Sequence, residues 1–237
     1  MSPGLTMVSG SNDVPITSDQ MYRIEEKGHE LLGMQRVYMM ENAGHGIADL
    51  VVSEFKGRLT DKTKIVAICG TGNNGGDCFV AIRHLAAYID SIYTIILLGH
   101  HSNLRSEEAR INWNIISKMN SVEVIEINQF TEAINDTISE ADIILDGIFG
   151  TGIKGEIRDP QASAIDLINS SNAYKIAVDI PSGLDPTSGK ADKKCIKADI
   201  TITFHRLKKG LIDNERFTGK VYVEHIGIPR EAETGIV

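Results

Sequence analysis

The stretch 70–77, GTGNNGGD, combines residue types that can bind a polar ligand. An apolar run, residues 65–69, precedes it and an amphipathic run, residues 79–85, follows it, which is the pattern of a strand, a glycine turn and a helix. The free backbone N–H groups at such a helix start can hold an anion. Glycines let the backbone approach a ligand closely, and two amides and a carboxylate add fixed polar contacts. The stretch therefore predicts a site that grips something polar.

Two further polar motifs follow apolar runs. They are residues 146–156, DGIFGTGIKGE, and residues 179–185, DIPSGLD. One carboxylate ends each of two predicted strands, Asp146 and Asp179. In parallel sheets ligands bind at the carboxyl ends of strands, near the point where the strand order reverses. All three motifs stand where that rule places a ligand site.

The glycine stretch has three other interpretations. Residues 70–75 match the dinucleotide fingerprint G-x-G-x-x-G, but that fold also needs an acidic residue at the end of the next strand, and residues 97–100, LLGH, contain none. A P-loop is disfavoured because Gly76 and Asp77 occupy its Lys and Ser/Thr positions, and a carboxylate there would repel a phosphate. A purely structural turn stays open, although two Asn and an Asp beside four Gly are hard to explain by turn chemistry alone.

Composition predicts one large α/β domain. The chain has 237 residues, with 42% apolar and 24% charged, and a net charge of −8 without a basic stripe, which disfavours nucleic-acid binding. The three cysteines form no CxxC pair, which indicates reduced thiols in structural roles. Residues 1–16 contain no Lys or Arg, so they lack the features of a signal peptide or presequence, and no apolar run has the length of a membrane span. We expect a cytoplasmic protein.

Hydrophobic patterning predicts a mostly parallel central sheet with helices on both sides and two helices before it. The strand candidates are 64–69, 92–98, 122–127, 142–146, 174–179, 199–204 and 220–224. The helix candidates between them are 77–89, 105–119, 130–138 and 160–170.

Residues 1–16 are expected to be a disordered lead-in, and residues 17–237 to form the domain. Thr17 and Gln20 have the spacing of a capping box, so a helix should run from there to about Lys27. A second helix is expected from about Arg36 to Phe55. Its small pair, Ala43 and Gly44, would permit a close neighbour in this chain or in a second subunit.

Five motifs in order resemble the NAD(P)H-hydrate epimerase family, the YjeF N-terminal domain. The resemblance covers about residues 18–227 and is carried by 39–44 (MMENAG), 73–77 (NNGGD), 146–152 (DGIFGTG), 179–183 (DIPSG) and the run from Ala198-Asp199 through Thr203-Phe204 to Lys208 and Gly210-Leu211. It implies a Rossmann-like three-layer αβα sandwich. Members equilibrate the R and S forms of hydrated NADH and NADPH at C6 of the damaged nicotinamide ring. A separate dehydratase partner and a homodimer are also implied.

The resemblance also implies the site residues. The hydrated dinucleotide is expected to contact Asn73, Asn74, Gly75, Gly76, Asp77, Gly150, Thr151, Gly152, Ile153, Lys154, Gly155, Glu156 and Asp179. A potassium ion (K+) is expected at Asn74, Asp146 and Ser182. The chemistry agrees, because a hard cation takes oxygen ligands, and an amide, a carboxylate and carbonyls beside a Ser supply them.

The expected reaction needs an acid/base group. The C6 hydroxyl lies next to a ring nitrogen whose lone pair assists its departure, so the enzyme must protonate the leaving oxygen and stabilise a cationic intermediate. We predict Asp179 in this role, because a strand-end carboxylate can project into the crevice, with Asp146 as the second candidate. The structural alternative for each is a carboxylate that only caps the following turn.

A non-catalytic binding scaffold is the competing function. Related domains in messenger-RNA decapping scaffolds resemble this fold without epimerase activity, whereas the presence of Asp146 and Asp179 with residues 73–74 favours an enzyme. Cys78 stands where the family usually has Gly and is expected to narrow the pocket. The adjacent pair at 100–101, His-His, is not expected to bind zinc, because no cysteine or acidic cluster supports it.

Overall fold

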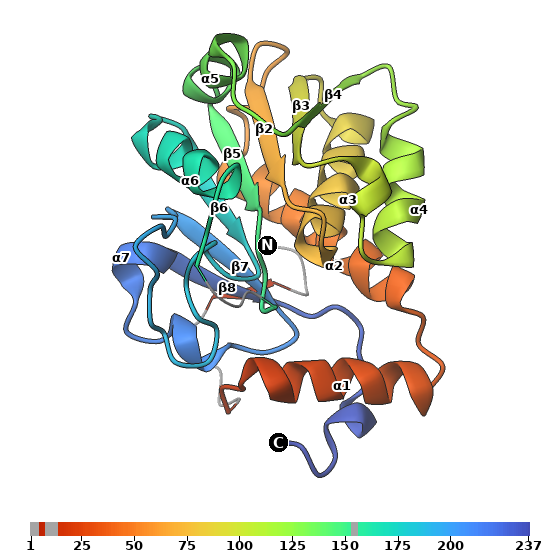
Figure 1. The fold of residues 1–237 in the computed structure, drawn as a ribbon. Coiled ribbons are helices and arrows are strands. Elements are labelled where there is room, and N and C mark those ends of the chain that lie inside the picture. The colour runs from red at the N-terminus through yellow and green to blue at the C-terminus, as the bar shows by residue number, and fades with distance from the viewer. Residues whose placement is uncertain (1–4, 8–13, 153–155) are drawn as a thin grey trace.

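Each apolar run from residue 64 onward forms a strand of one sheet (Figure 1). The computed structural model describes residues 5–7, 14–152 and 156–237. The parallel strands are β2 (Lys64–Cys69), β3 (Ile92–Leu98), β4 (Val122–Ile127), β5 (Ile143–Gly147), β6 (Tyr174–Val178), β7 (Ile200–Phe204) and β8 (Lys220–Glu224). The predicted α/β class and parallel sheet are confirmed.

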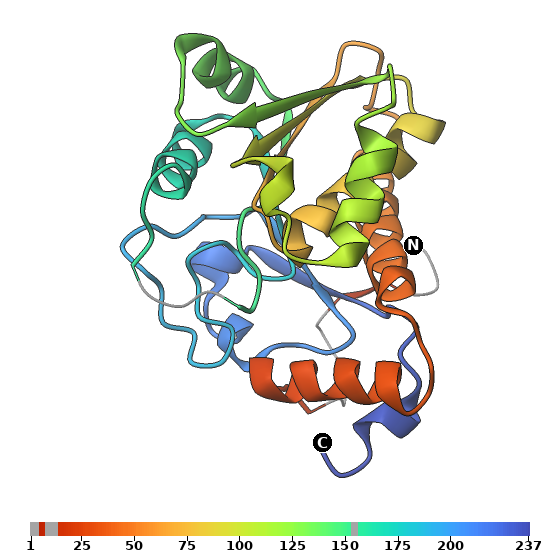
Figure 2. The ribbon, with the colours of Figure 1, turned by 45° about the vertical axis from the view of Figure 1, so that its right-hand side comes forward.

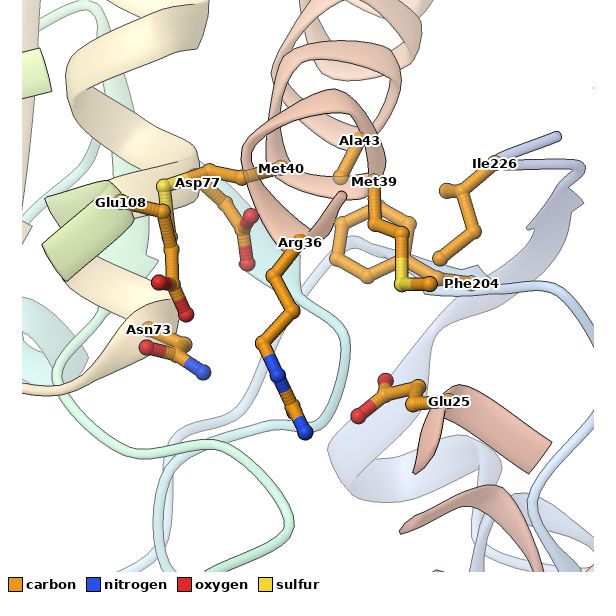
Figure 3. Close-up of a pocket in the computed structure, with 10 residues that line it drawn as sticks. All are labelled: Glu25, Arg36, Met39, Met40, Ala43, Asn73, Asp77, Glu108, Phe204 and Ile226. Carbon is orange, nitrogen blue, oxygen red and sulfur yellow. The ribbon is translucent and has the colours of Figure 1, made fainter. Parts of the chain in front are cut away.

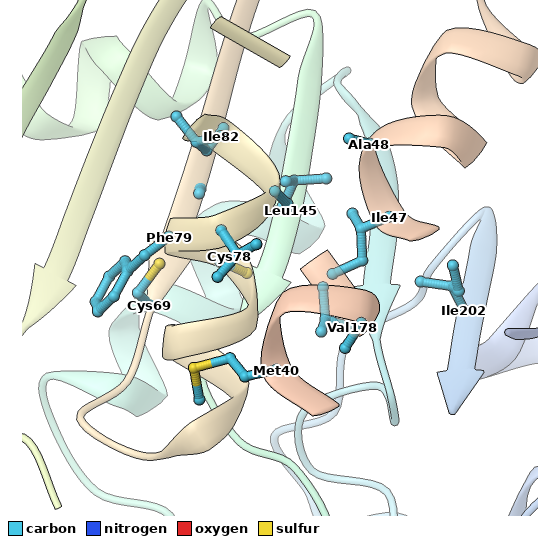
Figure 4. Close-up of a cluster of buried hydrophobic side chains, with 14 of the residues drawn as sticks. Met40, Ile47, Ala48, Cys69, Cys78, Phe79, Ile82, Leu145, Val178 and Ile202 are labelled. Atoms are coloured by element: carbon cyan, nitrogen blue, oxygen red, sulfur yellow. The ribbon is translucent and has the colours of Figure 1, made fainter. Parts of the chain in front are cut away.

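The strands are buried on both faces, as their continuous hydrophobicity predicted. In β2, Ala67 and Cys69 join the core on one face of the sheet, whereas Val66 and Ile68 join the core on the other. Figure 4 shows the first core, in which Cys69 and Leu145 pack against side chains from two helices.

Helices fill both outer layers (Figures 1 and 2). On one face α2, α3 and α4 pack against one another, and on the other face α5 packs against α6. Their bounds are α1 (Ser18–Glu30), α2 (Arg36–Glu54), α3 (Asn73–Tyr88), α4 (Glu107–Ile116), α5 (Glu132–Ser139), α6 (Gln161–Ser170) and the single turn α7 (Glu215–Thr218). No helix within the described ranges is long and apolar enough to cross a membrane.

The strand order reverses between β2 and β5. The sheet runs β1-β8-β7-β6-β5-β2-β3-β4, so the chain moves outward from β2 in one direction and from β5 in the other. The two central strands pair in parallel, with Ile68 opposite Asp146 and Cys69 opposite Gly147. The loops after β2 and β5 therefore diverge to opposite sides at the carboxyl edge, which leaves the crevice where such sheets bind ligands.

Helix α1 lies beyond the carboxyl ends of the strands (Figures 1 and 2). Thr17 begins it with the predicted capping box, since its side chain accepts from Gln20 N–H and the Gln20 side chain accepts from Thr17 N–H. The Gln20 amide also donates to the carbonyl of Ile236, 2.9 Å away. This helix and the C-terminal segment thus close over the edge of the sheet that carries the three polar motifs.

The described parts of the expected disordered lead-in are ordered. Strand β1 (Leu5–Met7) pairs antiparallel with β8 at the edge of the sheet. Ile16 is fully buried and forms a parallel bridge with Lys208. Ser, Gly and Pro composition suggested disorder, but an exposed sheet edge accepts almost any short strand through its backbone groups alone.

Helix α3 begins at Asn73, four residues before the expected start. Residues 73–77 are therefore the first turn of a helix rather than a loop. Glycine disfavours helices in isolation, so propensity placed the start too late. Packing requires it here, because a Cβ on Gly75 would lie 2.1 Å from the Gly70 carbonyl oxygen and one on Gly76 would lie 2.8 Å from Met40 Sδ.

Candidate functional site

Asp146 lies at the carboxyl end of β5, fully buried and held by the loop after β6. Its Oδ1 accepts from Ser182 Oγ at 2.5 Å and from Ile148 N at 3.3 Å, and its Oδ2 accepts from Ser182 N at 2.8 Å. Burial raises the pKa of Asp146 to about 6, while the bonds from Ser182 and Ile148 act in the opposite direction. The structure thus joins two of the predicted ion ligands directly.

Asn74 reaches the same group from α3. Its Nδ2 donates to the carbonyl of Phe149 at 2.9 Å, and the Phe149 N–H donates to Ser182 Oγ, also at 2.9 Å. The amide oxygen of Asn74 faces the backbone at Gly150. Motifs that are far apart in the sequence thereby place an amide oxygen, a carboxylate, a hydroxyl and a carbonyl in one connected group.

Asp179 ends β6 in the left-handed backbone region, with φ of 62°. Asp tolerates this conformation better than most residues. Its Oδ1 accepts from Lys208 Nζ at 2.7 Å, from Thr203 Oγ1 at 3.0 Å and from Phe204 N at 3.4 Å. Lys208 is almost fully buried and also donates to the Phe204 carbonyl at 2.7 Å. Asp179 is therefore paired with a buried ammonium.

A cavity of about 70 Å³ opens beside this ion pair (Figure 3). Phe204, whose backbone contacts both Asp179 and Lys208, forms part of its wall. The other lining residues are Glu25, Arg36, Met39, Met40, Ala43, Asn73, Asp77, Glu108 and Ile226. Helix α1 and the start of α2 supply one side, and α3 and α4 the other (Figure 3).

Carboxyl groups dominate the polar lining of the cavity. Burial raises the pKa of Asp77 well above its ordinary range, and the charges of Asp179, Glu25 and Glu108 act in the same direction. Burial likewise raises the pKa of Glu25 to about 7, against the lowering effect of Lys208. Such raised values at a cavity mark a candidate proton-transfer site.

The comparisons with known proteins agree with this geometry. The family model described as YjeF-related protein N-terminus matches residues 37–210, which include all three polar motifs. The chain belongs to the YjeF-related N-terminal family.

Relatives with assigned activities lie within that family. The NAD(P)H-hydrate epimerase of Cenarchaeum symbiosum (strain A) is 46% identical over 94% of this chain and 99% of its own length. The bifunctional NAD(P)H-hydrate repair enzyme Nnr of Pyrobaculum aerophilum is 44% identical over 92% of this chain, which corresponds to 42% of that longer protein. The crystal structure of the yeast protein ynu0 superposes with a TM-score of 0.79 at 22% identity, over 93% of this chain and 92% of its own, and this likeness supports the fold.

The motif residues predicted to bind substrate do not all lie together. Asn73 and Asp77 line the cavity, while Asn74 turns to Phe149 and the ion group. Gly150, Thr151 and Gly152 follow that group in a partly exposed loop, and Ile153, Lys154 and Gly155 lie outside the described residues. Glu156 is exposed and lies 4.0 Å from Arg158.

One sequence expectation is corrected, and one that left two alternatives open is decided. Cys78 does not narrow the pocket: it is fully buried in the core, where a Cβ on Gly147 would lie 2.4 Å from its sulfur. The Ala43–Gly44 pair is buried against α3 of the same chain, since a Cβ on Gly44 would lie 2.3 Å from Val80 Cβ. Helix packing within the subunit therefore uses the small residues, and this face of α2 is not free for a second subunit.

Sequence reasoning missed Glu25, Arg36 and Glu108. Each belongs to a different helix, and only the packing of α1, α2 and α4 around one space brings them together. The acid that was missing beside the histidines is Glu126. His101 Nδ1 lies 2.8 Å from Glu126 Oε1. This hydrogen bond accounts for the proximity of His101 and Glu126 in the exposed cluster that they form with His100.

Proposed function

We infer that this protein is an NAD(P)H-hydrate epimerase, which interconverts the R and S forms of hydrated NADH and NADPH at C6 of the nicotinamide ring. Membership of the YjeF-related N-terminal family and 46% identity to an archaeal epimerase over almost the full length of both chains support the activity. The bifunctional repair enzymes, in which a region like this chain occupies 42% of the length, support a dehydratase as its functional partner.

One structural observation supports the inference independently of sequence similarity. Polar side chains gather at the carboxyl edge of the sheet, where the strand order reverses. Asn74, Asp146 and Ser182 form one hydrogen-bonded group there, and Asp179 stands at the neighbouring strand end beside the cavity. A binding scaffold would have no need of them.

We propose that the oxygen group holds a potassium ion. Asn74 Oδ1, the Asp146 carboxylate and Ser182 Oγ are hard oxygen donors, and the Phe149 carbonyl lies among them. The set fits a large monovalent cation, because one carboxylate balances its charge and the other donors are neutral. When bound, the ion would supply positive charge that orients the pyrophosphate side of the substrate.

We propose that the reacting ring lies at the cavity; the position of Asn73 and Asp77, two residues of the expected substrate motif, in its lining supports this. We propose that Asp179, which pairs with Lys208, accepts the proton of the water that adds at C6 and stabilises positive charge on the ring. The loop of residues 150–156 is proposed to contact the phosphates of the dinucleotide. A homodimer and a cytoplasmic location are further proposals, and light scattering in solution tests the first.

The activity is tested by coupling. The protein is added to a dehydratase that consumes only the S form of the hydrates, with a mixture of both epimers as substrate. We expect consumption of the R form to accelerate in proportion to the protein added. If R is consumed no faster than it epimerises spontaneously, the inferred function is wrong and the scaffold reading takes its place. Asp179→Asn, checked for folding, should abolish the acceleration.

A further inference from the structure

Three carboxyl groups face the cavity. They come from different helices: Glu25 from α1, Asp77 from α3 and Glu108 from α4 (Figure 3). Across the residues that the structure describes, no N–H or O–H group donates to any of these three side chains, although Asp77 and Glu108 are each only 8% exposed. None of their oxygens is among the fully enclosed side-chain atoms that lack a partner, so these oxygens are open to the cavity. Three carboxyls that open into one cavity can accept hydrogen bonds from water or from a ligand held there.

The two predicted catalytic carboxyls have the opposite environment. Asp146 accepts three hydrogen bonds and Asp179 accepts three, one of them from the buried Lys208 ammonium. Burial raises the pKa of Asp146 to about 6 in spite of these donors, but Asp146 is not among the residues that line the cavity. Asp179 lies against the Lys208 ammonium, and its proposed role is to accept a proton. The group that gives one must be sought elsewhere at the cavity.

Glu25 is the best-placed donor of a proton. The charged groups that face it are Arg36 of α2, Glu108 of α4, and Asp179 and Lys208 at the strand ends, and it in turn acts on Asp77 of α3. The Arg36 guanidinium pairs with Glu26 on the outer side of α1, and so its charge is shared. Burial, the largest effect, raises the pKa of Glu25 to about 7, where a carboxyl can both give and regain a proton. Burial and the neighbouring acids raise the pKa of Asp77 well above its ordinary range, so its carboxyl favours the protonated form that can donate a hydrogen bond to the ring.

We propose that the C6 edge of the hydrated nicotinamide ring enters this cavity and that Glu25 is the acid that protonates its leaving hydroxyl. The proposal rests on the epimerase function inferred above. It assigns a catalytic role to α1, a helix outside the region that the family model matches.

The step balances without a co-reactant. The Glu25 carboxyl gives its proton to the C6 hydroxyl, the C6–O bond breaks with its electron pair leaving on oxygen as water, and the ring-nitrogen lone pair forms the N1=C6 double bond. The resulting cation lies beside the Glu25 carboxylate and Glu108. Water adds to the other face of C6, its proton passes to Asp179, and exchange with solvent restores both carboxyls. No atom is gained or lost overall.

Glu25→Gln tests the proposal, because it keeps size and polarity but cannot transfer a proton. We expect kcat/KM in the coupled assay to fall at least ~100-fold with little change in KM. Wild-type kcat/KM should decrease as the pH rises through about 7, since Glu25 must be protonated, and the residual activity of Glu25→Gln should lack this decrease. Thermal unfolding should show the variant at least as stable as wild type at pH 8, because an unpaired buried charge is removed.

The matched control is Glu30→Gln, an exposed glutamate on the same helix, which should retain activity within about twofold. An active wild type with an equally active Glu25→Gln would overturn the role of Glu25 and leave the epimerase function standing. An inactive wild type would overturn the epimerase function itself, and this proposal with it.

Labelled water tests the bond that breaks. During epimerisation by wild type in water enriched in oxygen-18, each inverted molecule should carry one labelled oxygen at C6, measured by mass spectrometry. Inversion without label would mean that the C6–O bond stays intact and would overturn protonation of the leaving hydroxyl by Glu25.

Discussion

The Nζ atom of Lys208 lies 2.7 Å from Oδ1 of Asp179, with side-chain exposures of only 1% and 13%. The two residues are separated by 29 positions in the chain and meet because β6 and β7 are neighbours in the sheet. A charge pair so enclosed has lost most of its hydration, so each partner depends on the other.

Removing the Lys208 ammonium alone should therefore lower the stability of the fold more than removing both charges of the pair. We expect Lys208→Met to lower the free energy of unfolding by about 3–5 kcal/mol, because Asp179 is left charged and unpaired. The double variant Lys208→Met with Asp179→Asn should recover part of this loss. Urea denaturation measures both. Lys64→Met, which breaks an exposed pair with Glu140, is the control and should cost less than about 1 kcal/mol; an equal loss in the two single variants would contradict the dependence on burial.

Two glycines of the same turn should respond oppositely to a methyl group. A Cβ on Gly75 would lie 2.1 Å from the Gly70 carbonyl oxygen, a backbone atom that cannot move cheaply, whereas a Cβ on Gly72 meets nothing within 4 Å. Gly75→Ala should lower the free energy of unfolding by about 1–3 kcal/mol or more, and Gly72→Ala by less than about 0.5 kcal/mol. Calorimetry measures both free energies of unfolding. If the glycines served only to let a ligand approach, both variants would be as stable as wild type.

Potassium should stabilise the protein if the oxygen group binds it. A ligand that binds only the folded state adds about 2.7 kcal/mol when it is present at a hundred times its Kd. We expect a higher melting temperature in potassium chloride than in lithium chloride at equal ionic strength, and Asp146→Asn should remove the difference. Equal melting temperatures of wild type in the two salts would show that this group of oxygens binds no potassium.

Glu224 should make the protein less stable as the pH rises. Burial at the end of β8 raises its pKa to about 7, and the nearby charge of Asp49 acts in the same direction. The native state then holds a proton that the unfolded chain, at the ordinary value of 4.5, has already lost. The stability from this group is present below about pH 4.5 and disappears as the pH rises through about 7, a change of roughly 3 kcal/mol at most.

Glu224→Gln isolates this contribution. Its free energy of unfolding, minus that of wild type, should increase between pH 5 and pH 8. Glu123→Gln, an exposed strand residue, serves as the control and should give a difference that is independent of pH. A flat difference for Glu224→Gln as well would show that the Glu224 carboxyl is ionised in the folded protein throughout this range.

Much of the architecture could be predicted from the local pattern of apolar and turn residues. Strands 64–69, 92–98, 122–127 and 220–224 have their predicted bounds, because a buried parallel strand is a continuous apolar run between turn residues. The start of α3 was placed too late because the two glycines at 75–76 are disfavoured in a helix unless packing demands their lack of a side chain.

The sequence by itself determined the layered α/β fold, the three polar motifs at strand ends and the family, since each depends on residues close together in the chain. Only the tertiary structure decided which carboxyl groups accept hydrogen bonds from the protein and which do not. Asp179 acquires Lys208 across two strands, while Glu25 and Asp77 meet in a cavity between helices, where no donor from the described residues reaches them. The charge state of a carboxyl follows from burial and neighbours, and these are set by contacts between distant segments that no local pattern records.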